Sequence, residues 1–309
     1  MNKIIIICGP TAVGKTATSI KLAKKLDTEI ISADSMQIYK SMDIGTAKVS
    51  SDEMSGIKHH MIDIVKPNEN FSVSDFYNRS SKVIDRLFFE KKIPIIAGGT
   101  GLYINSLIYK MDFNKTSFDE NIRDKYWKMY YEYGSDYLYE LLLSKDKNMA
   151  QSIEKNNVKR VIRALEIFEN NDAMRVFSKI DEFQDYKVYM YVLKLDRSIL
   201  YERINHRVDM MIENGLIEEV KTLLKNGTDS DAQSMKAIGY RQIISYLQGE
   251  IDENTAIELI KRDSRRYAKR QYTWFRRYDF AKWIDVELKN IDEIAEYIMD
   301  DIKINNRLL

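Results

Sequence analysis

A glycine-rich segment near the start of the chain has the residue types and spacing that bind phosphate. It follows the pattern G-x-x-x-x-G-K-T and consists of Gly9, Pro10, Thr11, Ala12, Val13, Gly14, Lys15 and Thr16. In such a loop, between a strand and a helix, successive backbone N–H groups surround phosphate oxygens at the start of the helix. Lys15 then meets the phosphate charge, and the hydroxyl of Thr16 can ligate Mg²⁺. The segment predicts a polyphosphate site with Mg²⁺ as its cofactor.

The acid expected closest to these phosphates is Asp34. It follows a short apolar run at residues 30–33, and so lies at the carboxyl edge of a predicted parallel sheet, where ligands of such sheets bind. A nucleotide hydrolase normally carries a metal-binding acid at the end of a core strand, but the run at 93–97 ends in Gly-Gly-Thr. Three roles fit the position of Asp34: a metal ligand, a base on an incoming nucleophile, or a helix cap.

Two basic clusters indicate a polyanionic partner. Residues 261–277 include eight basic side chains and one acid, Asp263, and a second cluster lies at 159–163. A charge run is often only a solvated helix face, but two separate basic surfaces fit a long polyanion better than a small metabolite. Arg203 and Arg207, four residues apart in a predicted helix, could either clamp a phosphate or pair with surface acids.

Composition places the chain among ordinary globular proteins. Its 309 residues are 44% hydrophobic and 31% charged, and 48 basic against 47 acidic residues give a net charge of +1. This balance gives no overall reason to expect nucleic acid or a membrane, so any such partner must bind a local patch. The single cysteine excludes an intramolecular disulfide, and no apolar run approaches the roughly 20 residues of a membrane span. We expect a cytoplasmic protein with no membrane segment.

The elements that must position these residues alternate between strands and helices. Short apolar segments typical of strands buried in a parallel sheet lie at residues 4–8, 29–32, 61–65, 93–97 and 187–195. Helical patterns lie at residues 15–26, 73–91, 118–177, 198–225 and 254–278. We predict an α/β fold with a P-loop core, a doubly wound parallel sheet over residues 1–115 and 185–309, and an inserted all-helical domain at residues 116–184.

Taken together, these motifs resemble one family closely, the tRNA dimethylallyltransferases, which are P-loop tRNA prenyltransferases. Besides the phosphate loop, the resemblance rests on the ordered segments DSMQIY at 34–39, DIGTAK at 43–48, HHMID at 59–63, FSVSDF at 71–76, GGTGLY at 98–103, RVIRALE at 160–166, AIGYR at 237–241 and AKRQYTWF at 268–275. It covers nearly the whole chain, from about residue 4 to about residue 277. Many enzymes share the phosphate loop, but this ordered set is specific.

The resemblance implies transfer of a dimethylallyl group from dimethylallyl diphosphate to the exocyclic amine of the adenosine 3′-adjacent to the tRNA anticodon, with release of pyrophosphate. It implies three catalytic residues: Asp34 as the base on that amine, Thr16 with Mg²⁺ on the diphosphate beside Lys15, and Arg207 on the departing pyrophosphate. It also implies that tRNA is contacted by Asp34, Ser35, Met36, Gln37, Thr100, Arg123, Lys159, Arg160, Arg163, Lys269 and Gln271. Its partners would be tRNA and dimethylallyl diphosphate, with no obligate protein partner.

Two other functions are compatible with the same residues. An ATP-dependent kinase of a nucleoside or small metabolite would use Asp34 to activate a hydroxyl and the helical insertion as a lid. An RNA-binding nucleotide switch would bind RNA without modifying it. Only a prenyltransferase would consume dimethylallyl diphosphate when, and only when, tRNA is present.

Overall fold

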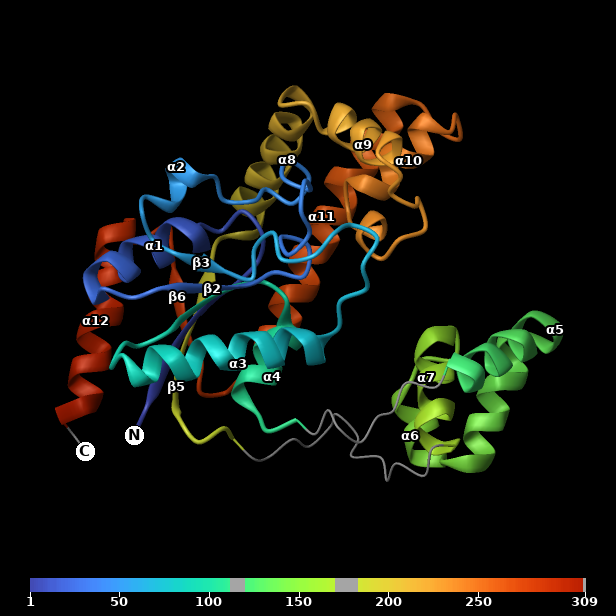
Figure 1. The fold of residues 1–309 in the computed structure, drawn as a ribbon, viewed down its shortest axis with the longest axis horizontal. Helices are drawn as coiled ribbons and strands as arrows, with labels where there is room; N and C mark the ends of the chain where they lie inside the picture. The colour runs from blue at the N-terminus through green and yellow to red at the C-terminus, as the bar shows by residue number, and fades with distance from the viewer. Residues whose placement is uncertain (112–119, 170–182, 308–309) are drawn as a thin grey trace. The chain divides into compact units, whose positions relative to one another are not determined.

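The computed structural model describes residues 1–111, 120–169 and 183–307 (Figure 1). The chain forms two compact units, one made of Met1–Ile108 with Gln184–Leu309 and the other of Tyr109–Phe183. The expected domain boundary between residues 115 and 116 lies outside the described residues. The chain re-enters the first unit at Gln184, one residue before the expected start of the second core segment.

A six-stranded sheet, parallel throughout, forms the centre of the first unit, with the strand order β3-β2-β4-β1-β5-β6. The strands are β1 (Lys3–Cys8), β2 (Ile30–Ala33), β3 (His59–His60), β4 (Ile95–Gly98), β5 (Lys187–Lys194) and β6 (Lys282–Asp285). The order runs outward from β1 in both directions, so the sheet is doubly wound. The α/β class predicted from the sequence is confirmed, and the crevice at the carboxyl end of β1 is the expected ligand site.

The edge strand β3 is displaced from its predicted position. The sequence predicts a strand at 61–65, whereas β3 ends at His60. Met61 and Asp63 have φ values of 65° and 54°, a left-handed conformation that is incompatible with a continuing strand. The prediction was wrong because apolar content alone does not report this turn, which carries Asp63 toward the loop that follows β2.

Helices cover both faces of the sheet, and α1 and α3 lie on opposite sides of it (Figure 1). The helices of this unit are α1 (Lys15–Leu26), α2 (Ser51–Met54), α3 (Val73–Phe89), α4 (Gly101–Ile108), α8 (Arg197–Glu213), α9 (Leu216–Lys225), α10 (Tyr240–Leu247), α11 (Glu253–Phe275) and α12 (Ile291–Arg307), with a 3₁₀ turn η1 (Ser234–Lys236). The predicted helix at 198–225 is two helices, because Gly215 adopts φ 96° between α8 and α9.

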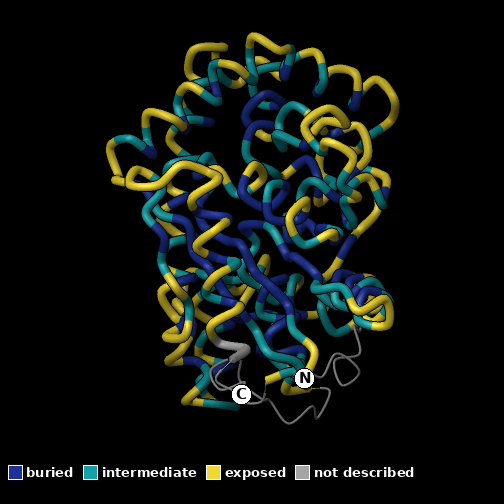
Figure 2. The backbone as a smooth tube through the Cα atoms, turned by 90° about the vertical axis from the view of Figure 1, so that its left-hand side faces the viewer, coloured by how far each residue is buried: buried dark blue, intermediate teal, exposed yellow. Residues whose placement is uncertain are grey.

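Apolar burial holds the helices on the sheet. Ile5 and Ile7 of β1 share one core cluster with Leu22 of α1 and Ile298 of α12, and all four side chains are fully buried. Figure 2 shows this distribution along the chain, with buried segments inside the first unit and exposed segments on its surface. Each such side chain contributes about 1.5–3 kcal/mol by leaving water, so the sheet and its helices form a rigid base for the loops at the carboxyl edge.

The second unit contains the helices α5 (Glu120–Lys145), α6 (Lys147–Ser152) and α7 (Val158–Glu169), and an isolated antiparallel bridge pairs Tyr109 with Phe183 at its two ends. Gly134, with φ 83° and ψ 177°, interrupts α5. Leu138 and Leu142 of α5 pack with Leu165 of α7 in a core separate from that of the sheet. An apolar core of its own is what an inserted domain requires.

Candidate active site

The phosphate loop lies between β1 and α1, as its pattern predicts. Gly9 has φ 140°, and a Cβ atom there would lie 2.5 Å from the carbonyl oxygen of Leu193, so the first glycine is required by close backbone packing. Gly14 has φ 96° and begins α1 without a side-chain cap. The first N–H groups of α1, together with the helix dipole, therefore favour an anion at this end.

Lys15 spans the loop that it is expected to serve. Its Nζ atom donates a hydrogen bond to the carbonyl oxygen of Pro10 at 2.7 Å. Burial, with a smaller contribution from the positive charge of Arg207, lowers the pKa of Lys15 to about 8, and the negative charge of Asp34 partly opposes the shift. A bound diphosphate would add to the counter-charge that Asp34 supplies to this ammonium group.

Arg207 reaches the phosphate loop from α8. Its Nη1 atom donates to the hydroxyl oxygen of Thr11 at 3.3 Å, across 196 residues of sequence. Burial lowers the pKa of Arg207, while the charge of Asp34 raises it. Arg203, four residues earlier, is exposed. Of the two arginines, the structure therefore places Arg207 where it can meet a phosphate.

Asp34 follows β2 and faces the same space. Its Oδ1 atom accepts a hydrogen bond from the backbone N–H of Met36 at 2.9 Å, so one carboxylate oxygen caps a local turn. Asp34 also lines a cavity together with Thr11 and Arg207. No helix begins in the described residues directly after Asp34, so it caps this turn rather than the helix considered from the sequence, and the turn holds the carboxylate at the cavity wall.

The cavity has a volume of about 400 Å³. Its polar lining includes Thr11, Asp34 and Arg207, and its apolar lining consists of Met36, Ile204, Val208, Met211, Ala237, Ile238 and Ile260. Ile204 and Val208 lie on one face of α8 as buried residues, and the structure shows that beside Arg207 they also line the cavity. A phosphate site next to an apolar wall suits a ligand with a charged head and a hydrocarbon tail.

Several cavity residues were not identified from the sequence. Tyr267 and Ser264 of α11 line the cavity, as do Gly45 and Thr46 from the loop after β2. The motif segment DIGTAK contains Gly45 and Thr46 without indicating that they face a ligand. Burial and the charge of Asp34 raise the pKa of Tyr267 to about 12, so its phenol stays protonated at neutral pH.

Gln271 of α11 hydrogen-bonds the backbone of the phosphate loop. It is only 5% exposed, accepts the N–H of Thr11 at 3.0 Å, and donates to the carbonyl oxygen of Gly99 at 3.0 Å. A Cβ atom on Gly99 would lie 2.1 Å from the Gln271 amide nitrogen, so a larger residue at 99 would displace the Gln271 amide from its two backbone partners. Both polar atoms of its amide bind the protein's own backbone, and the contact of Gln271 with tRNA stays a prediction.

The other residues of the Asp34 turn are tied to the same region. Thr100 accepts the N–H of Ser35 at 3.0 Å, and Ser35 and Met36 line the cavity. Gln37 donates to the carbonyl oxygens of Thr46 and Ala47 at 3.4 and 3.2 Å. Ser35 and Met36 are therefore placed to meet a ligand, whereas the side chain of Gln37 holds the loop.

In the helical unit, the predicted tRNA contacts divide into two pairs. Arg123 and Arg163 both bind Glu166, which is 3% exposed, and Arg163 does so at 2.8 Å. Lys159 and Arg160 are exposed at the start of α7. The first pair neutralises a buried carboxylate, and the second pair presents its charge to solvent, as a nucleic-acid contact must.

The basic helix α11 is partly neutralised in the same way. Asp263 binds Arg241 at 2.7 Å and Arg262 at 3.0 Å. Lys269 and Arg270 are exposed, and Arg270 also lines the cavity. Positive charge therefore lies at the cavity's edge, where the sequence predicts contact with a polyanion at Lys269.

The oxygen donors present fit a magnesium ion. Across the described residues there is no group of three or more His, Cys, Asp or Glu side chains that could hold a metal without help. Mg²⁺ commonly uses one or two protein oxygens together with substrate phosphates and water. The exposed hydroxyl of Thr16 at the start of α1 is such a donor.

Among the residues that the structure describes, no helix has the length and apolar character needed to cross a bilayer.

The chain is a P-loop α/β protein. Its glycine-rich loop connects β1 of a doubly wound parallel sheet to α1, and Lys15 and Arg207 both contact that loop. A sequence model described as IPP transferase matches residues 37–278, and the chain belongs to that family. The fold and family predicted from the sequence are thereby confirmed. The family also disfavours the kinase alternative, as do the relatives described next.

Relatives and solved structures of this kind match along the full chain. A "tRNA dimethylallyltransferase" of Clostridioides difficile (strain 630) is 53% identical over 98% of this chain and 100% of its own length. The full-length tRNA isopentenylpyrophosphate transferase from Bacillus halodurans has a TM-score of 0.76 and 42% identity, covering 100% of this chain and 99% of its own. A eukaryotic dimethylallyltransferase whose crystal structures are described as snapshots of it acting on tRNA has a TM-score of 0.79 and 28% identity, covering 92% of this chain and 74% of its own.

Proposed function

We propose that the protein transfers a dimethylallyl group from dimethylallyl diphosphate to the exocyclic amine of the adenosine 3′-adjacent to the tRNA anticodon. The observation that carries the proposal is the cavity in which Asp34 shares a wall with Arg207 and Thr11 of the phosphate loop. Asp34, which can accept a proton from an amine, and Arg207, which can bind a diphosphate, thus line the same cavity. Apolar side chains line the rest of it.

The chemistry follows from these charges. As the allylic C–O bond of dimethylallyl diphosphate breaks, negative charge grows on the pyrophosphate, where the loop N–H groups, Lys15 and Arg207 can stabilise it. The adenine amine nitrogen forms the new C–N bond to the allylic carbon and loses a proton, which Asp34 accepts. Mg²⁺ held at Thr16 would neutralise part of the diphosphate charge. This reaction needs no activated water.

The acceptor base must leave its stack to reach this cavity. Extruding a base costs a few kcal/mol, and contacts to the phosphate backbone can offset that cost. Lys159, Arg160 and Lys269 are exposed and carry the required positive charge. We assign them to the tRNA backbone, and Ser35 and Met36 to the extruded adenosine beside Asp34.

The direct test is incubation with unmodified tRNA and radiolabelled dimethylallyl diphosphate, followed by digestion to nucleosides. We expect label in one modified adenosine and release of pyrophosphate that depends on tRNA. Phosphorylation of a small acceptor by ATP, with no label in tRNA, would support the kinase alternative instead. Binding of tRNA without label transfer would support the RNA-binding switch.

The pKa of Lys15 predicts how pyrophosphate binding depends on pH. A group with a pKa of about 8 is cationic at pH 7 and loses its charge as the pH rises through that value. Affinity for pyrophosphate should therefore fall above about pH 8, approaching tenfold per pH unit. Calorimetric titration from pH 6.5 to 10 measures this. Because pyrophosphate itself titrates, Lys15→Met is the control, and an identical pH dependence in that variant would contradict the assignment.

Arg160 should contribute to the salt dependence of tRNA binding. Each phosphate contact that is lost should reduce the slope of log affinity against log salt by about 0.7–0.9. We expect Arg160→Ala to show this reduction and Arg160→Lys, which keeps the charge, to retain the wild-type slope. Binding measured from 50 to 300 mM salt gives both values. A wild-type slope in Arg160→Ala would make Arg160 a solvated helix residue.

A further inference from the structure

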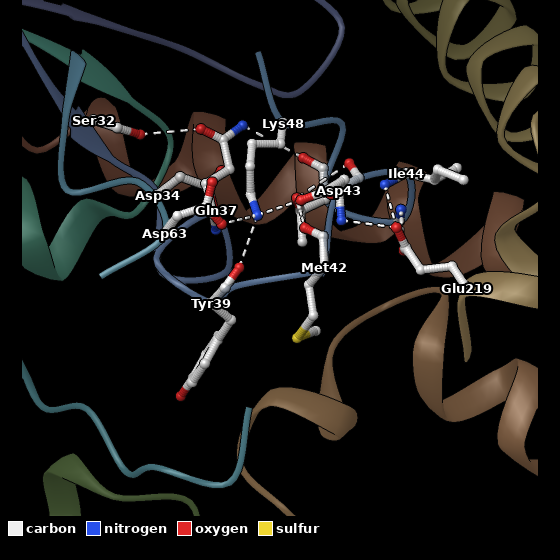
Figure 3. A network of polar contacts seen from close by, with 12 residues as sticks. Ser32, Asp34, Gln37, Tyr39, Met42, Asp43, Ile44, Lys48, Asp63 and Glu219 are labelled. Carbon is white, nitrogen blue, oxygen red and sulfur yellow. Dashed lines mark hydrogen bonds and ion pairs between the residues drawn. The ribbon is translucent and has the colours of Figure 1, made fainter. Parts of the chain in front are cut away.

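The loop between β2 and α2, residues 34–50, carries Asp34 but contains no helix or strand. Ser41 and Ala47 within it adopt φ values of 62° and 45°, which cost conformational energy in residues with a Cβ atom. A loop in such a conformation keeps its shape only where surrounding groups hold its backbone. Two charged side chains do so, and neither takes part in the mechanism above (Figure 3).

The first is Glu219 of α9, whose carboxylate accepts hydrogen bonds from the backbone of the loop. Its Oε2 atom accepts the N–H groups of Asp43 at 2.8 Å and Ile44 at 2.7 Å, and its Oε1 atom accepts that of Gly45 at 3.1 Å. The hydroxyl of Tyr240 donates to the same Oε1 atom at 2.6 Å. One carboxylate thus receives four donors, three of them consecutive backbone groups, and hydrogen bonds to an ionised acceptor are the strong ones.

The second is Lys48, whose side chain is only 6% exposed. Its Nζ atom donates to the carbonyl oxygen of Tyr39 at 2.7 Å and to the carboxylates of Asp43 at 2.5 Å and Asp63 at 2.6 Å. In Figure 3 this ammonium group lies at the centre of the three oxygens. It joins the last part of the loop to Tyr39 and Asp43 within it, and fastens all three to Asp63 in the turn after β3.

A continuous set of contacts leads from these two groups to Asp34. Gly45 is the last of the residues that Glu219 holds and Thr46 follows it, and both line the cavity with Asp34. The carbonyl oxygens of Thr46 and Ala47 accept the amide of Gln37, and the backbone N–H of Gln37 lies 3.4 Å from Asp34 Oδ1. A displacement of residues 43–47 therefore reaches both the cavity wall and the turn that orients the carboxylate.

We infer that Glu219 and Lys48 are positioning residues, which clamp the loop after β2 so that Asp34 is aimed at the acceptor in the cavity. The inference rests on the proposed function, in which Asp34 is the base. Neither residue touches the phosphate loop in the contacts above, so the clamp serves the acceptor half of the site and leaves the diphosphate half unaffected.

Glu219→Gln tests the clamp with little change in size. An amide has one acceptor oxygen and one NH₂ group, so two of the four donors would face another donor. Because a misplacement of about 1 Å at a reacting group can cost about 100-fold, we expect the single-turnover rate constant to fall about 10- to 30-fold, with the pyrophosphate Kd unchanged. Glu219→Asp, which keeps the charge, should recover part of the loss. Hydrogen exchange should show lost protection at the amides of residues 43–45.

Glu218→Gln is the matched control, because Glu218 is the neighbouring residue on α9. Its side chain is 72% exposed and forms an ion pair with Lys221 on the same helix. Lys48→Met provides an independent test from the other side of the loop, with the exposed Lys40→Met as its control. We expect both controls to retain the wild-type rate constant.

Rate constant and amplitude separate positioning from stability. If Glu219 and Lys48 served only to keep the protein folded, their variants would lose single-turnover amplitude while the remaining molecules reacted at the wild-type rate. Wild-type rate constants in both variants, or an equal weakening of pyrophosphate binding, would overturn the clamp while leaving the proposed function intact. An inactive wild-type protein would instead overturn the proposed function itself.

Discussion

Asp34→Asn should reduce the single-turnover rate of prenyl transfer by about 10²–10⁴-fold, the usual contribution of a positioned general base. Asparagine keeps a side-chain oxygen that can accept the N–H of Met36, as Asp34 Oδ1 does at 2.9 Å. The turn is thereby preserved and only the base is removed. Asp34→Ala removes both, so any further loss in the alanine variant measures the contribution of the turn.

Pyrophosphate binding discriminates between the roles left open for Asp34. The negative charge of Asp34 raises the pKa of Lys15, so its removal should lower that pKa. The same change removes a repulsive charge from beside the anion site, and we expect the pyrophosphate Kd at pH 7 to be nearly unchanged. An equal loss of magnesium-dependent pyrophosphate affinity and of turnover would make Asp34 a metal ligand rather than a base.

The phosphate loop could be predicted from the sequence because its geometry is local. Eight consecutive residues determine the pattern of N–H groups and the position of Lys15, although Gly9 packs against the distant backbone of Leu193 and Thr11 binds Gln271 and Arg207. The parallel sheet was predictable for a similar reason, since strands buried on both faces are apolar throughout. β3 was the exception, because the left-handed turn at Met61 has no apolar signature.

The rest of the site depends on long-range contacts that have no sequence pattern. The helical repeat places Ile204 and Val208 near Arg207, but it does not say whether that face meets the core or a ligand. Gln271 lies in a basic segment, which indicates RNA binding, yet its burial assigns it to the loop backbone. Glu219 is one acid among many, and its importance becomes visible only through its contacts with a loop about 175 residues away.

Arg207→Ala should slow single-turnover transfer by about 10²–10³-fold, the scale of losing one preorganised donor at a developing anion. Arg207 is held against Thr11 of the phosphate loop, and α8 carries it there on a buried stripe that includes Ile204 and Val208. The charge on the leaving pyrophosphate grows as the C–O bond breaks, so the contact should be stronger in the transition state than with the intact diphosphate.

Ground-state binding should change far less, for a reason specific to this site. The positive charge of Arg207 lowers the pKa of Lys15, so removing it should raise that pKa and leave Lys15 more fully protonated. The two cations therefore partly compensate for one another in binding, but not in stabilising the departing charge. Arg207→Lys should recover only part of the rate, because an ammonium group lacks the two-pronged geometry of a guanidinium. A wild-type single-turnover rate in Arg207→Ala at saturating substrates would refute this role, and the exposed Arg203 on the same helix would become the next candidate.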